Sequence, residues 1–112
     1  MSTTQKKLMN PAQLTASPVT YYTAPGSTNT TITNCLLVNT TSSVVIVTLY
    51  VVPSGGSAST TNQAVYVKVP ANSQRNVFEL VNATLSAGDT FEAEADTATA
   101  VSLHLSGKET VV

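Results

Sequence analysis

The residue types that could act as nucleophile and base are scarce in this chain. It contains a single Cys, Cys35, and a single His, His104, so a Ser or Cys nucleophile has one imidazole available to activate it. His104 alternates with Leu103 and Leu105, which predicts a position on the polar face of a strand. Cys35 lies in the apolar stretch 32–38, where a Cys is typical of a small core residue. We therefore expect no catalytic residue, no enzymatic activity and no cofactor.

Three carboxylates at every second position form the other chemical feature. Glu92, Glu94 and Asp96 are expected to project from one face of a strand. Alternate side chains on a flat strand are about 6.8 Å apart, whereas calcium sites wrap several oxygens around the ion, so we expect no metal site. The chain has no Trp to form a sugar platform, which argues against a glycosidase pair. We interpret the row as a solvated face or as a salt-bridging contact to a partner.

The elements that position these residues are predicted to be strands. Val, Thr, Ile and Tyr are enriched from Val19 onward, and these residues favour strands. Turn-forming residues separate seven expected strands, near residues 19–23, 30–38, 43–52, 63–69, 74–80, 89–96 and 99–106. This spacing predicts an all-β, single-domain antiparallel β-sandwich, jelly-roll-like, of about seven to eight short strands. The stretch 44–52 is apolar on both faces except at Thr48 and is expected to be a central strand.

Alternation also predicts which side chains are buried. They are Val65, Val67 and Val69 in one strand, Phe91, Ala93 and Ala95 in the next-to-last, and Val101, Leu103 and Leu105 in the last. If the last two strands form an antiparallel hairpin with the loop 97–99, matching their apolar positions places Glu92 opposite His104.

Length and charge limit the classes of partner. The 112 residues fit one small domain, in which 42% of residues are hydrophobic, 10% are charged and the net charge is -1. No basic stripe exists to neutralise a row of phosphates, so nucleic acid is not expected as a partner. The apolar run 44–52 is too short for a membrane helix, so no membrane partner is expected either. A modest core and a surface with little charge repulsion between copies favour a homo-oligomer.

The first 17 residues differ from the rest of the chain. Residues 1–17 are polar and aperiodic, which predicts an extended N-terminal arm ahead of a sandwich domain at 18–112. No apolar run follows the two early lysines, so a secretory signal is not expected. Five side chains of the arm are expected to anchor it on another surface: Lys6, Lys7, Leu8, Met9 and Leu14. A disordered tail is the alternative.

Six short motifs occur in order along the chain: Leu14-Thr-Ala-Ser17, Tyr21-Tyr-Thr-Ala-Pro25, Asn39-Thr-Thr41, Val52-Pro-Ser-Gly-Gly-Ser-Ala58, Leu85-Ser-Ala-Gly-Asp-Thr90 and Ser106-Gly-Lys-Glu109. Their order resembles that of small virion proteins of tailed bacteriophages. The resemblance implies a structural protein of the virion, a capsid decoration (cement) protein that stabilises the head lattice. Its partner would be the major capsid protein or another virion protein. The alternative is a tail- or fibre-associated structural module, or one that binds a receptor or carbohydrate.

Overall fold

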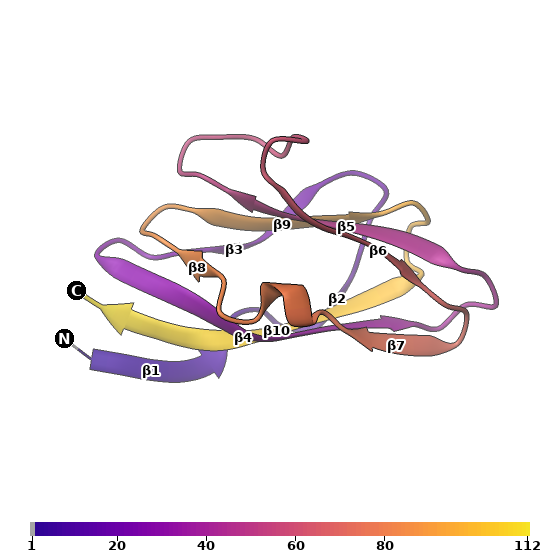
Figure 1. Cartoon of the computed structure of the whole chain (residues 1–112), viewed down its shortest axis with the longest axis horizontal. Helices are drawn as coiled ribbons and strands as arrows, with labels where there is room; N and C mark the ends of the chain where they lie inside the picture. Colours follow the sequence, from indigo (N-terminus) through magenta and orange to yellow (C-terminus); the bar gives the residue numbers. More distant parts are fainter. Residues whose placement is uncertain (1) are drawn as a thin grey trace.

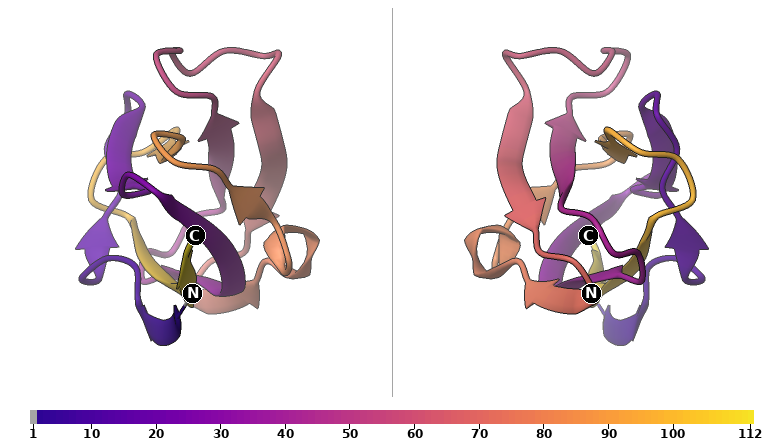
Figure 2. Two further views of the ribbon diagram at one scale, coloured as in Figure 1. Left: turned by 90° about the vertical axis from the view of Figure 1, so that its left-hand side faces the viewer. Right: turned by 90° about the vertical axis from the view of Figure 1, so that its right-hand side faces the viewer.

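The computed structural model describes residues 2–112, and Met1 lies outside the described residues. Two antiparallel sheets lie face to face in one elongated domain of 46 × 26 × 20 Å (Figures 1 and 2). The strands are β1 (Ser2–Lys7), β2 (Ala12–Gln13), β3 (Val19–Thr23), β4 (Thr28–Asn39), β5 (Val45–Val52), β6 (Gln63–Val69), β7 (Ser73–Asn76), β8 (Thr84–Leu85), β9 (Thr90–Ala95) and β10 (Val101–Val111), with a 3-10 turn, η1 (Phe78–Leu80). The prediction of an all-β sandwich is confirmed.

The two sheets are built from different sets of strands. Sheet A has the order β1-β10-β4-β7, and the short strands β2 and β8 pair with β10 and β4. Sheet B has the order β3-β9-β5-β6. Sheet B lies above sheet A in Figure 1, and the end views of Figure 2 show the two layers. Among residues 2–112, no helix is long and apolar enough to cross a membrane.

The core lies between the inner faces of the sheets. All nine side chains that alternation predicts to be buried are buried in the structure, with Phe91 the largest of them. The expectation of a central strand at 44–52 is confirmed as well, because β5 lies between β9 and β6. Even the outward side chains Thr48 and Tyr50 are only 8% exposed there, since neighbouring strands cover them on both sides.

The expected hairpin of the last two strands is wrong. β9 belongs to sheet B and β10 to sheet A, and residues 96–100 cross from one sheet to the other. Glu92 pairs with Tyr50 of β5, whereas His104 pairs with Leu36 of β4. Alternation identifies the buried face of each strand, but two strands can share a core from opposite sheets as well as from one sheet. The register derived for a single sheet therefore does not apply.

The expected N-terminal arm is also wrong for the described residues. β1 pairs with the end of β10, and β2 pairs with its beginning. Leu8 donates its backbone N–H to Leu105 (3.0 Å) and Leu14 donates to Val101 (2.8 Å). Both leucine side chains are buried in the core of their own chain. The sandwich therefore includes residues 2–17.

Two other expected boundaries change. The stretch 74–80 is not one strand, because β7 ends at Asn76 and η1 follows it. β10 continues to Val111, where it lies between β1 and β4. Gly107 permits this close packing, since a Cβ at that position would lie 2.3 Å from the carbonyl oxygen of Thr31.

Candidate interaction surface

Among residues 2–112, β6 has a neighbouring strand on one side only, and its open edge carries unpaired backbone groups. Asp96, which directly follows β9, donates its backbone N–H to the carbonyl oxygen of Ile46 of β5 (2.9 Å). The backbone groups of the even residues of β5 therefore point toward β9. Successive residues of a strand direct their N–H and C=O to opposite sides, so Val47 directs its groups toward β6. Val47 faces Val67 in the β5–β6 pair. It follows that Val67 bonds to β5, whereas Tyr66 and Lys68 direct their backbone groups to the open edge.

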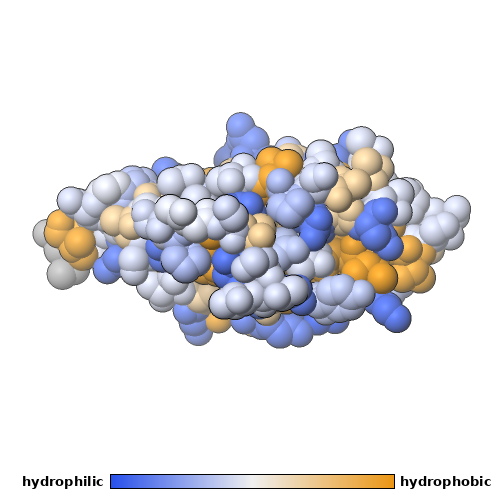
Figure 3. All heavy atoms as spheres, turned by 90° about the horizontal axis from the view of Figure 1, so that it is seen from above, coloured by the Kyte–Doolittle hydropathy of each residue, from blue (hydrophilic) through white to orange (hydrophobic). Residues whose placement is uncertain are grey.

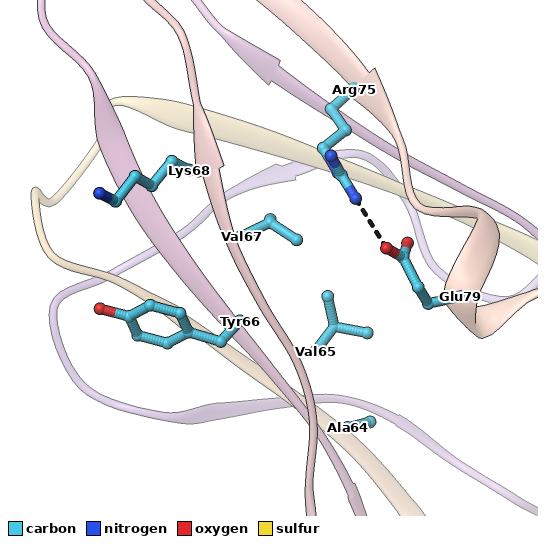
Figure 4. Close-up of a pocket in the computed structure, with 7 residues that line it drawn as sticks. All are labelled: Ala64, Val65, Tyr66, Val67, Lys68, Arg75 and Glu79. Carbon is cyan, nitrogen blue, oxygen red and sulfur yellow. Dashed lines mark hydrogen bonds and ion pairs between the residues drawn. The ribbon is translucent and has the colours of Figure 1, made fainter.

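A groove of about 560 Å³ runs along this edge. Figure 4 shows Tyr66 and Lys68 pointing to one side of β6, with Val65 and Val67 on the side of Arg75 and Glu79. Its lining residues are Ala64, Val65, Tyr66, Val67, Lys68, Arg75 and Glu79.

The far wall of the groove is an ion pair. Arg75 of β7 donates to the carboxylate of Glu79 on η1 across 2.8 Å. The buried Nε of Arg75 has no hydrogen-bond partner among residues 2–112. The groove thus combines an apolar floor with a free strand edge, which is the combination that receives an extended peptide.

The predicted acidic row lies on the outer face of sheet B. Figure 3 shows the molecule from this side as a mostly pale surface with scattered hydrophilic residues and hydrophobic patches. Each carboxylate has a partner in its own sheet. Glu92 accepts a hydrogen bond from Thr90 (3.2 Å), Glu94 from Tyr50 (2.5 Å) and Asp96 from the backbone of Ile46 (3.1 Å). The bond to Glu94, followed by burial, raises the pKa of Tyr50 to about 12. No group of metal-binding side chains is found among residues 2–112. A contact between this row and a partner remains a prediction.

The two predicted arm lysines have intramolecular partners. Lys6 pairs with Glu109 of β10 at 3.3 Å, and Lys7 donates to Asn10 at 3.5 Å. Glu109 also accepts a hydrogen bond from the hydroxyl of Tyr22 on β3, which joins the two sheets at this end. Burial, followed by this bond, raises the pKa of Tyr22 to about 12.

The three apolar side chains expected to anchor the arm on another surface pack against the core of their own chain. Leu8 and Leu14 are buried, and Met9 is partly buried against the same core. In this structure the leucines are therefore not available to another surface. These apolar residues are widely spaced and do not alternate as in a strand, and for this reason the sequence predicts an arm here.

Cys35 and His104 lie where alternation places them. Cys35 is 1% exposed in the core, and burial raises the pKa of its thiol to about 12. His104 is half-buried and opposite Leu36 on the outer face of sheet A. The two side chains thus project to opposite faces of sheet A, which does not bring them together as nucleophile and base.

The open edge of β6 was not found from the sequence. Alternation indicated the inward valines, but it contains no information on whether a strand has one neighbour or two. The one local signal is the residue that follows the strand, Pro70, because proline is tolerated where no ladder bond is needed.

No family model and no curated protein matches the chain. Its fold is similar to that of a solved chain described as coming from Bacillus endospore appendages that form a novel family of disulfide-linked pili. The likeness has a TM-score of 0.59 at 18% identity and covers 99% of this chain and 89% of that chain. At this identity it establishes the shared fold.

The expectation of a phage capsid decoration protein is wrong on this comparison. The structural neighbour is a bacterial appendage protein and not a phage protein. The capsid partner, the virion location and the tail or fibre alternative depended on the same resemblance, and they lose its support. The motifs that suggested it are turns and strand ends, which different sandwich proteins share.

Proposed function

We propose that this chain is a noncatalytic structural subunit that assembles with copies of itself by pairing sheet edges. The observation that carries the proposal is the open edge of β6, where Tyr66 and Lys68 direct their backbone groups away from β5. An exposed, regular strand edge with apolar residues on one face is a template for another strand. The low charge of the chain, 10% of its residues, weakens the repulsion that would separate copies.

The structural neighbour supports an assembling role by analogy, since it comes from pili. Its pili are described as disulfide-linked, whereas this chain has one Cys and that Cys is buried. Contacts between copies of this chain are therefore noncovalent. Backbone hydrogen bonds along a strand edge provide such contacts, and repetition through an assembly adds their strength.

The test is assembly of the full chain and of one edge variant. Tyr66→Pro removes a backbone N–H from the open edge while leaving the Val65 and Val67 bonds to β5 in place. We expect the unaltered chain to form oligomers in sedimentation velocity and electron microscopy as its concentration rises. Tyr66→Pro is expected to remain folded and monomeric.

Tyr66→Phe is the matched control, because it keeps the backbone N–H and should assemble normally. An unaltered chain that stays monomeric at every concentration would overturn the proposal. Assembly of Tyr66→Pro at the level of the control would show that the contact lies elsewhere.

A further inference from the structure

The edge strands of the two sheets differ in how well they are protected against pairing. β3 lies between Pro18 and Pro25, and its register shifts between Thr20 and Tyr22. β7 and β8 have four and two residues. β1 is exposed at every position and carries two lysines. Prolines, bulges, short length and lysines are the devices that prevent edge pairing, and β6 between Val65 and Val69 has none of them except Lys68.

The unpaired groups of β6 are complementary to those of a second β6. In an antiparallel pair centred on Val67, Tyr66 of each copy faces Lys68 of the other. Each such residue pair exchanges two N–H to C=O bonds, so the contact contains four hydrogen bonds and uses the backbone groups of both residues. Val67 then faces its own counterpart at a position without hydrogen bonds.

Neighbouring registers are less favourable. A shift toward the C-terminus places Lys68 opposite Lys68 and brings in Pro70, which has no N–H. A shift toward the N-terminus requires residues before Val65, where the pairing with β5 is irregular between Leu49 and Tyr50. The register centred on Val67 uses the regular part of the strand.

Side chains support the same register. Tyr66 is 59% exposed, and in this pairing its ring lies beside the ammonium group of Lys68 from the second copy, an arrangement that favours a cation–π contact. On the other face, the second copy lies along the groove lined by Val65, Val67 and Arg75 (Figure 4).

We infer that β6 of one copy pairs antiparallel with β6 of a second copy about a two-fold axis at Val67. The inference rests on the proposed function and specifies its partner surface. Because this contact is isologous, it joins two copies and leaves other surfaces to extend an assembly.

Disulfide trapping in the full chain tests this register. Residues facing each other without hydrogen bonds have Cα atoms about 4.5 Å apart, within the range that a disulfide spans. Val67→Cys is expected to give a covalent dimer under mild oxidation, with peptide mapping joining position 67 of both copies. Val65→Cys and Val69→Cys are the matched controls: each alone should stay monomeric on a nonreducing gel, whereas their mixture should form a heterodimer.

A second pair of variants avoids changes in the core. Tyr66→Cys mixed with Lys68→Cys should give a heterodimer. These two exposed positions face each other in the proposed pairing, with their Cα atoms about 5.5 Å apart. Oligomers without either cross-link would overturn the β6–β6 register while leaving self-assembly intact. Loss of oligomers in Gln5→Pro would then assign β1 of the second copy as the partner. A chain that never forms oligomers would overturn both the register and the proposed function.

Discussion

β1 is an edge strand of sheet A and β6 is an edge strand of sheet B. Each directs alternate backbone groups to an open edge. In β1 these groups belong to Thr3, Gln5 and Lys7, since Leu8 bonds to β10. Every residue of β1 is exposed, whereas every second residue of β6 from Val65 to Val69 is buried.

The difference shows how the core determines the character of an edge. β6 contributes to the core, so folding requires its alternating valines. As a consequence, the core-facing side of this edge strand is apolar. β1 covers β10 without entering the core, so polar residues and lysines are tolerated along it. The unpaired backbone groups are therefore protected against strand pairing at the edge of β1 and accessible to it at the edge of β6.

The largest expected effect concerns what holds the N-terminal segment in place. Leu14 is completely buried, and Leu14→Ala should lower the free energy of unfolding by about 2–5 kcal/mol. Thr4→Ala, in the exposed β1, should change it by less than about 0.5 kcal/mol. Urea unfolding followed by circular dichroism measures both. Equal, small effects would mean that residues 2–17 do not belong to the core in solution.

The sequence predicted the faces of the strands and not their neighbours. The valines of β6 and the alternate residues of β9 and β10 have a period of two that the core requires, so their burial could be predicted locally. The pairing of Ser2 with Val111 joins the two ends of the chain, and no local pattern encodes it. The crossing between β9 and β10 was missed for the same reason. The candidate site, an open edge, depends on such long-range pairing.

A pair of prolines on β6 tests the assignment of its two edges. Val67→Pro removes an N–H that bonds to β5, and Tyr66→Pro removes one that faces the open edge. We expect Val67→Pro to lower the free energy of unfolding by at least about 1 kcal/mol more than Tyr66→Pro, because a ladder hydrogen bond is lost. Thermal unfolding of the monomers measures the difference. The reverse order would mean that the open groups belong to the valines.

Alkaline pH offers a comparison of two buried tyrosines of sheet B, one bonded to sheet A and one bonded within sheet B. Tyr22 contacts Glu109 beside β1, and Tyr50 contacts Glu94 on sheet B. Their pKa values are raised from 10.0 to about 12, so the folded state retains protons that the unfolded state releases. The contribution of these two hydroxyls to stability should be constant below about pH 10 and should be lost as pH rises toward about 12.

Tyr22→Phe and Tyr50→Phe are the variants that identify the source of this dependence. Each should reduce the alkaline loss of stability, measured as unfolding midpoints across the pH series. The absorbance of tyrosinate in the folded chain reports the two raised pKa values directly. Unchanged slopes in both variants would exclude these hydroxyls as its origin.

The smallest effect is expected on the outer face of sheet A, at His104. This residue is half-buried beside Leu36 and lies on the opposite face of its sheet from Cys35. Because its imidazole makes no side-chain hydrogen bond among the described residues, His104→Ala should change the free energy of unfolding by no more than about 0.5 kcal/mol. Assembly should also be unchanged if β6 provides the contact, and sedimentation beside the unaltered chain and Tyr66→Pro measures this. A folded His104→Ala chain that fails to assemble would show that the interface includes the outer face of sheet A and not the edge of sheet B, because no residue of β6 has been altered.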